Sequence, residues 1–78
     1  MSEDPKRFTR EQLKELTFTL QFRDQQQRDL VRQKLFQLHD LHDGLIYRRD
    51  LHLELLKMQE TYEISDVERQ HVEAALFG

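Results

Sequence analysis

The only glycine inside the chain, Gly44, lies between two apolar stripes that cannot share one helix face. The first stripe recurs at spacings of four, three, four and three residues: Val31, Leu35, Leu38, His42 and Leu45. The second recurs at four, four, three and four: Tyr47, Leu51, Leu55, Met58 and Tyr62. At about 100° per residue, one continuous helix would place the stripes roughly half a turn apart. We therefore predict that the chain breaks at Asp43-Gly44 and folds back as an antiparallel helical hairpin.

The alternative is one long helix that continues through Gly44. Three later apolar residues stay in phase with the first stripe: Ile46, Leu53 and Leu56. These residues give the segment after Gly44 a second apolar side, and a helix that is apolar on two sides is normally buried on both. We expect one side to face the helix before Gly44. The other would face the chain ends or a second copy of the protein.

Residues that cap helix N-termini mark three helix starts. Thr9 and Gln12 fit a capping box, in which the two side chains satisfy free backbone amides of the first turn. Ser65 and Glu68 repeat that pattern, and Asp24 is a suitable N-cap. We therefore predict a helix that starts at Thr9 and three later helices, over about 25–43, 45–61 and 66–77.

These elements define an all-α fold, a small three- to four-helix bundle built on the antiparallel hairpin around Gly44 and completed by dimerisation. We expect one helical domain over residues 9–78, preceded by a disordered tail over residues 1–8. The predicted core is Leu35, Leu38, Leu51 and Leu55. The last helix carries one apolar stripe, with Val72 and Leu76 beside it: Ile64, Val67, His71 and Ala75.

The segment Leu16–Phe22 fits two structures. Apolar and polar residues alternate strictly over its seven positions, as in a half-buried β-strand. Leu16 and Leu20, however, also continue a helical spacing from Leu13. A lone strand leaves its backbone without partners, and no second strand is evident in the chain. We favour a helix and keep the strand as the alternative.

Composition limits the class of protein. The chain has 78 residues, of which 37% are hydrophobic and 35% charged, and its net charge is −3. It has no cysteine, which excludes disulfides and thiolate chemistry. It also lacks an apolar run of about 18 residues, and its first residues lack the apolar core of a signal peptide. We expect a cytoplasmic protein with no membrane contact, and a homodimer, since nothing covalent reinforces so small a core.

Histidine and acidic residues gather where the first stripe ends. His39, His42 and Asp43 are spaced so that all three could reach one side of a helix end. Imidazole and carboxylate groups suit divalent metals, and His52 or Glu54 could complete a set. His42 nevertheless lies within the apolar stripe, and the spacing matches no structural zinc site. We therefore expect no metal and no cofactor.

The sequence contains no motif of catalysis. It has no glycine-rich phosphate loop and no nucleophile motif. Its serines are Ser2 and Ser65, and the second is explained as a helix cap. Helical bundles of this size rarely enclose a cavity that fits a substrate. We expect a protein that is not an enzyme.

Nucleic-acid binding is the alternative function, and it depends on the strand at residues 16–22. Two such strands in a dimer could enter the major groove as a β-ribbon and read bases with four side chains: Thr17, Thr19, Gln21 and Arg23. Arg28 and Arg32, one turn apart, could contact phosphate. Residues 1–39 carry a net charge of only +2, and residues 40–78 carry −5. So small a basic surplus disfavours nucleic acid as a partner.

The leading prediction is a helical module that docks onto a larger protein as an adaptor or regulator. The chain is too short to bury all its large apolar residues, and exposed apolar patches mark interfaces. Five residues are the candidates for a contact with an unidentified protein partner: Phe18, Phe22, Phe36, Leu53 and Leu56. Self-association would use part of the same surface.

Overall fold

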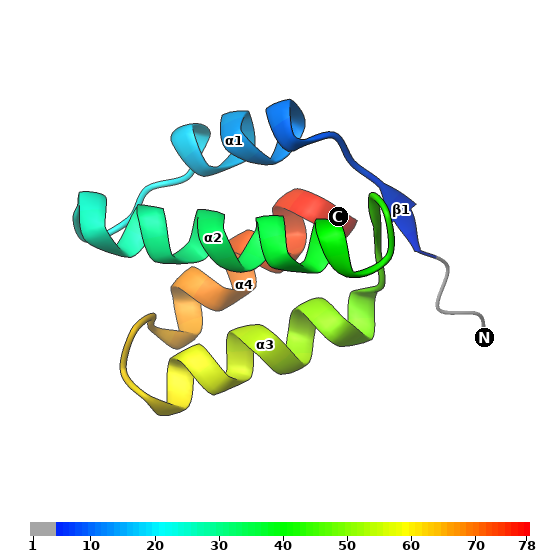
Figure 1. Cartoon of the computed structure of the whole chain (residues 1–78). Coiled ribbons are helices and arrows are strands. Elements are labelled where there is room, and N and C mark those ends of the chain that lie inside the picture. Colours follow the sequence, from blue (N-terminus) through cyan, green and yellow to red (C-terminus); the bar gives the residue numbers. More distant parts are fainter. Residues whose placement is uncertain (1–4) are drawn as a thin grey trace.

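The computed structural model describes residues 5–78. Four helices make up most of it, namely α1 (Arg10–Thr19), α2 (Gln25–Leu41), α3 (Arg48–Glu60) and α4 (Asp66–Phe77). Two short strands, β1 (Lys6–Arg7) and β2 (Leu45–Ile46), pair antiparallel in the register Lys6↔Ile46 and Arg7↔Leu45 (Figure 1). The mostly helical fold is confirmed, whereas the small sheet was not predicted.

The three predicted N-caps are present. The Thr9 hydroxyl accepts from the Gln12 amide at 3.0 Å, and the Gln12 side chain accepts from the Thr9 amide at 2.9 Å. Ser65 and Glu68 form the same reciprocal pair at the start of α4. The Asp24 side chain accepts from the backbone amide of the third residue of α2 at 2.8 Å. Local sequence therefore decides where α1, α2 and α4 begin.

The segment that could be a strand is helical as far as Thr19. Leu20 caps α1 and donates its amide to the Leu16 carbonyl, and the chain then runs without regular structure to Asp24. The Thr17 hydroxyl donates to the Lys14 carbonyl at 2.7 Å, and the Thr19 hydroxyl to that of Leu16 at 2.9 Å. These bonds accommodate both threonines in a helix, so the strand alternative over residues 16–22 is wrong.

The chain leaves the helical path before Gly44. Helix α2 ends at Leu41, two residues earlier than predicted, and α3 begins at Arg48, three residues later. Asp43 and Gly44 have φ of 52° and 96° in the turn, and the Gly44 amide donates to the His39 carbonyl at 2.7 Å. The alternative of one continuous helix is therefore wrong.

The start of the chain is more ordered than we predicted. Residues 1–4 of the predicted disordered tail lie outside the described residues. Lys6 and Arg7, which also belong to that tail, form β1, and the Phe8 amide donates to the Gly44 carbonyl at 2.9 Å. The turn between α2 and α3 therefore provides hydrogen-bond partners for the backbone of residues 6–8, which lie outside any helix.

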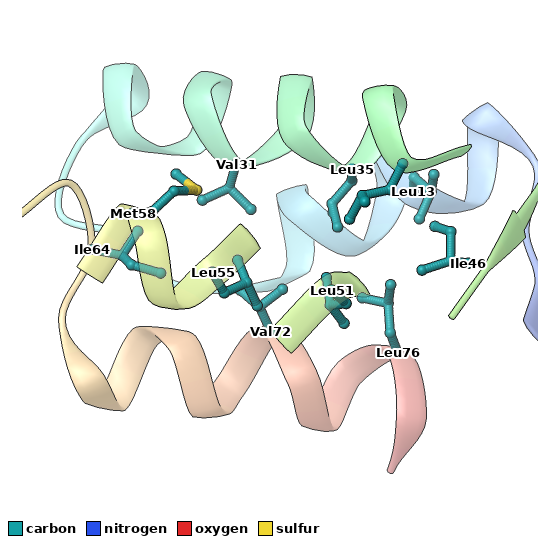
Figure 2. Close-up of a cluster of buried hydrophobic side chains, with 11 residues drawn as sticks. Leu13, Val31, Leu35, Ile46, Leu51, Leu55, Met58, Ile64, Val72 and Leu76 are labelled. Atoms are coloured by element: carbon teal, nitrogen blue, oxygen red, sulfur yellow. The ribbon is translucent and has the colours of Figure 1, made fainter. Parts of the chain in front are cut away.

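One apolar core joins all four helices (Figure 2). The predicted core residues Leu35, Leu38, Leu51 and Leu55 are buried, which confirms that prediction. The stripe predicted for α4 is out of phase, because Val72 and Leu76 are buried whereas Val67 is 57% exposed. The buried apolar residues are Leu13, Val31, Leu35, Leu38, Ile46, Leu51, Leu55, Met58, Ile64, Val72 and Leu76.

Helix α3 lies along one edge of the molecule. In Figure 1, α2 lies between α1 and α3, and α4 packs against α3. The second apolar side of α3 is buried only in part, since Leu53 is 46% exposed. The chain ends therefore do not cover this side completely, and its cover by a second copy stays a prediction. Among residues 5–78, no helix is both long and apolar enough to cross a membrane.

Candidate protein-contact site

Two of the exposed large apolar side chains lie across one groove between α2 and α3. Leu41 of α2 is 64% exposed and Leu53 of α3 is 46% exposed. They line a surface groove of about 430 Å³ together with the buried Leu38 and the half-buried Leu56. We call these four leucines the groove patch. An apolar surface that is open to water in this way is a candidate protein contact.

The groove patch has a charged rim. Glu54 of α3 lies 3.6 Å from the Lys34 ammonium of α2 and 3.6 Å from that of Lys57. Asp50 lies 3.5 Å from Nε2 of His42. These are surface pairs, each of which adds little to stability. Their effect is to surround the leucines with groups of both signs, which can orient a bound protein.

The five residues predicted to bind a partner do not form one surface. Only Leu53 and Leu56 belong to the groove patch. The guanidinium carbon of Arg10 lies over the ring of Phe36, 4.9 Å from the ring centroid, so Phe36 faces α1. Leu41, which the partner-binding set omitted, completes the patch in place of the three phenylalanines.

Phe18 and Phe22 form a second, separate cluster where α1 meets α2. Phe18 is 55% exposed, and the Arg28 guanidinium lies 5.6 Å from its ring centroid. The same guanidinium lies 6.0 Å from the centroid of Phe22. Arg28 Nε also donates to the Thr17 carbonyl at 3.0 Å. Arg28 therefore holds the end of α1 against α2, and its head group is engaged within the chain.

The residues assigned to base reading do not share one face. Thr17 is fully buried, whereas Thr19 and Gln21 are exposed. Of the arginines, Arg32 pairs with Asp29 at 3.1 Å, and Arg23 lies 3.7 Å from Asp24. The β-ribbon that would have aligned these side chains is absent from the described residues, where this part of the chain is α1 and the loop that follows it.

The histidines considered as metal ligands contact separate carboxylates. His39 Nδ1 lies 2.9 Å from Asp40, and His52 Nδ1 lies 3.0 Å from Glu73. His42 faces Asp50, as described above, and Asp43 belongs to neither the His39 pair nor the His42 pair. Over residues 5–78, no three His, Cys, Asp or Glu side chains are grouped so as to hold one metal ion.

Gln27 is a buried polar junction that sequence reasoning missed. Its Oε1 accepts from the Arg23 amide at 2.6 Å, and its Nε2 donates to the Glu63 carbonyl and to Glu68 Oε1, each at 2.9 Å. The sequence did contain an indication, since Gln27 lies four residues before Val31 and continues the buried stripe of α2. This one side chain ties the start of α2 to the α3–α4 connection and to the first turn of α4.

The same junction perturbs a carboxylate. Burial works to raise the pKa of Glu68, but hydrogen bonds from Ser65 and from Gln27 outweigh it. The pKa therefore lies below the usual value of 4.5. The ionised carboxylate is the form that these donors stabilise. Glu68 is thus both a helix cap and an acceptor for α2.

Comparisons with protein-family models, with curated proteins and with solved structures gave no match to this chain.

Proposed function

We propose that this chain is a non-enzymatic protein-interaction module, an adaptor or regulator that docks onto a larger protein through the groove patch. One observation carries the proposal: Leu41 and Leu53 are exposed on two different helices and line the same groove. A cytoplasmic location and an antiparallel α2–α3 hairpin completed by dimerisation belong to the same proposal.

Burial of these leucines in a complex supplies the driving force. Transfer of a fully exposed leucine side chain out of water is worth about 1.5–3 kcal/mol. Leu41 and Leu53 are each about half exposed and lie on one surface, so a partner that covers the groove gains from both at once. The charged rim disfavours a partner whose own charges do not match it. This arrangement of an apolar centre and a polar rim is the usual anatomy of a protein interface.

The proposal is tested by capture of partners from a native lysate with wild-type protein and with the variant Leu41→Gln/Leu53→Gln. Val67→Gln is the matched control, because Val67 is 57% exposed on α4 and lies outside the groove patch. We expect a specific partner to be lost with the double variant and kept with the control. The complex should survive high salt, because apolar burial does not depend on ionic attraction.

Nuclease treatment in parallel separates protein from nucleic-acid partners. Partners that disappear with nuclease, and whose binding falls steeply as salt rises, would indicate binding to a phosphate backbone instead. Equal capture by wild type and by the groove variant would show that the groove patch is not the contact surface.

A further inference from the structure

The outer face of α3 carries four residues in one stripe. Arg49, Leu53, Leu56 and Glu60 follow one another at spacings of four, three and four residues. At 100° per residue they lie within about 60° of arc, so they share one side of the helix. Three of them are exposed and Leu56 is half-buried. We call these four residues the α3 stripe; the helix that carries them lies at one edge of the molecule (Figure 1).

The α3 stripe is symmetric in apolar character and antisymmetric in charge. Leu53 and Leu56 flank its midpoint. Arg49 and Glu60 lie at equal distances on either side, about 8 Å along the helix axis at a rise of 1.5 Å per residue. Reversing the direction of the helix therefore leaves the leucines in place and exchanges the positive and negative ends.

The two charged ends of the α3 stripe form no ion pair within residues 5–78. Glu54 on the same helix, by contrast, does form ion pairs, with Lys34 and with Lys57. Arg49 and Glu60 are both exposed, so their side chains are accessible to another molecule.

We propose that the α3 stripe binds a second copy of this chain, with α3 packed antiparallel against α3 of that copy around a two-fold axis at the stripe midpoint. In that arrangement Leu53 faces Leu56 of the copy, and Arg49 faces Glu60 of the copy, each pair occurring twice. The inference rests on the proposed function, because it names the protein that covers the α3 side of the groove patch.

Charge complementarity selects both the occupant and its direction. A parallel copy would place Arg49 against Arg49 and Glu60 against Glu60, which is repulsive at both ends. The antiparallel copy replaces both repulsions with attractions. On the flank toward α2, the same operation brings Lys57 near Asp50 of the copy. Glu54, close to the midpoint, comes near Glu54 of the copy, and its charge is balanced within its own chain by Lys34 and Lys57. Self-complementarity of this kind is what a two-fold interface requires.

Light scattering and sedimentation over a concentration series test the proposal. We expect wild-type protein to form a dimer. Arg49→Glu and Glu60→Arg should each raise the dimer dissociation constant by roughly tenfold or more, because each reversal turns two attractive pairs into repulsive ones. The double variant R49E/E60R restores the antisymmetric stripe and should dimerise like the wild type. A parallel dimer would give no loss with either single variant.

Mixing provides the sharpest measurement. Arg49→Glu and Glu60→Arg proteins, which each dimerise weakly alone, should form a heterodimer when combined. Both charged positions of the first variant are then negative and face positive positions of the second. Lys14→Glu is the matched control, since Lys14 is exposed on α1, away from the α3 stripe, and its reversal should leave the dimer unchanged. Circular dichroism verifies that each variant keeps its helix content.

Three results would overturn the inference: a wild-type monomer at every concentration, a dimer that ignores the reversals, or a double variant that is not restored. A monomer whose lysate partner is still lost with Leu41→Gln/Leu53→Gln would leave docking through the groove patch intact, would remove dimerisation from the proposed function, and would show that the partner is a different protein. A dimer that captures no protein from the lysate would support the α3–α3 contact but not docking onto a larger protein.

Discussion

Nε2 of Gln27, at the start of α2, donates a hydrogen bond to Oε1 of Glu68 in the first turn of α4, over 2.9 Å and across 41 residues of sequence. Gln27 is 1% exposed, so this bond is made away from water. Each of its polar atoms has a partner, and within the described residues no buried side-chain nitrogen or oxygen lacks one. Removing such a junction costs more than its bonds contribute where partner groups remain partly buried without a hydrogen bond, and the bonds of the Gln27 side chain are partly buried.

Gln27→Leu should therefore lower the free energy of unfolding by about 1–3 kcal/mol, the usual penalty for buried polar groups that lose a partner. The substitution removes the hydrogen bonds that the Gln27 side chain makes with the Arg23 backbone amide and with the Glu63 carbonyl. Urea denaturation measures the change. Gln33→Leu is the control, because Gln33 is exposed on the same helix and makes no such bonds. Equal stability of the two variants would contradict a structural role for Gln27.

Gln27→Glu should destabilise the protein in a way that depends on pH. At neutral pH the introduced carboxylate would face the ionised carboxylate of Glu68 at hydrogen-bonding distance, and like charges repel. Lowering the pH protonates one of the two and removes the repulsion. We expect the stability gap to wild type to be widest near pH 7 and to narrow toward pH 5. A gap that is constant across this range would show that the two side chains move apart.

Leu55→Ala should cost on the order of 2–5 kcal/mol, because it leaves a cavity where a fully buried leucine was. In a domain of marginal stability, that loss can unfold much of the population at ambient temperature. Leu53→Ala on the opposite side of the same helix is the control, and it should change the melting temperature of the monomer by much less. Thermal melts followed by circular dichroism give both values.

Gly44→Ala should destabilise the turn, because its φ of 96° is strained for any residue with a Cβ. The new methyl group would also lie 3.2 Å from an Arg7 side-chain nitrogen and 3.5 Å from the Phe8 carbonyl. Asp43→Gly should have the opposite sign, since Asp43 holds a φ of 52° that glycine adopts without strain. Stabilisation by Gly44→Ala would instead indicate that the turn is helical in solution.

We expect Asp40 to contribute to the loss of stability of this protein in acid. Hydrogen bonds from His39 and from Arg10 lower the pKa of this carboxyl from its ordinary value of 3.8. A lowered folded-state pKa stabilises the fold above the unfolded value, and this contribution is lost as pH falls below 3.8 through the folded-state pKa. Asp40→Asn should therefore unfold with a shallower pH dependence below that value. An unchanged acid profile would show that Asp40 contributes nothing measurable.

Local sequence predicted the helix starts because a cap is decided by three or four neighbouring residues. Ser65 and Glu68 satisfy each other's backbone amides wherever the helix later packs. The buried side of α4 depends instead on how this helix packs against α3. The sequence placed Val67 on the apolar stripe and Val72 beside it, and in the structure Val72 is buried and Val67 exposed. The two-residue strands were missed because so short a pairing has no period to detect.

The candidate site was predicted only in part for the same reason. Leu53 and Leu56 were identified because one helix had apolar residues on two sides. Phe36 and Leu41 lie on opposite sides of α2, facing α1 and α3 respectively, and only the arrangement of three helices determines which side remains open. A list of apolar residues left over from the core cannot distinguish these sides.

The pairing of β1 with β2 has a consequence for dynamics. The Phe8 amide is bonded to the Gly44 carbonyl across 36 residues, at the outer end of a sheet of two very short strands. Amides in such peripheral elements exchange with solvent by local opening and not by global unfolding. Deuterium uptake at Phe8 therefore reports how often the first strand detaches, separately from the stability of the helices behind it.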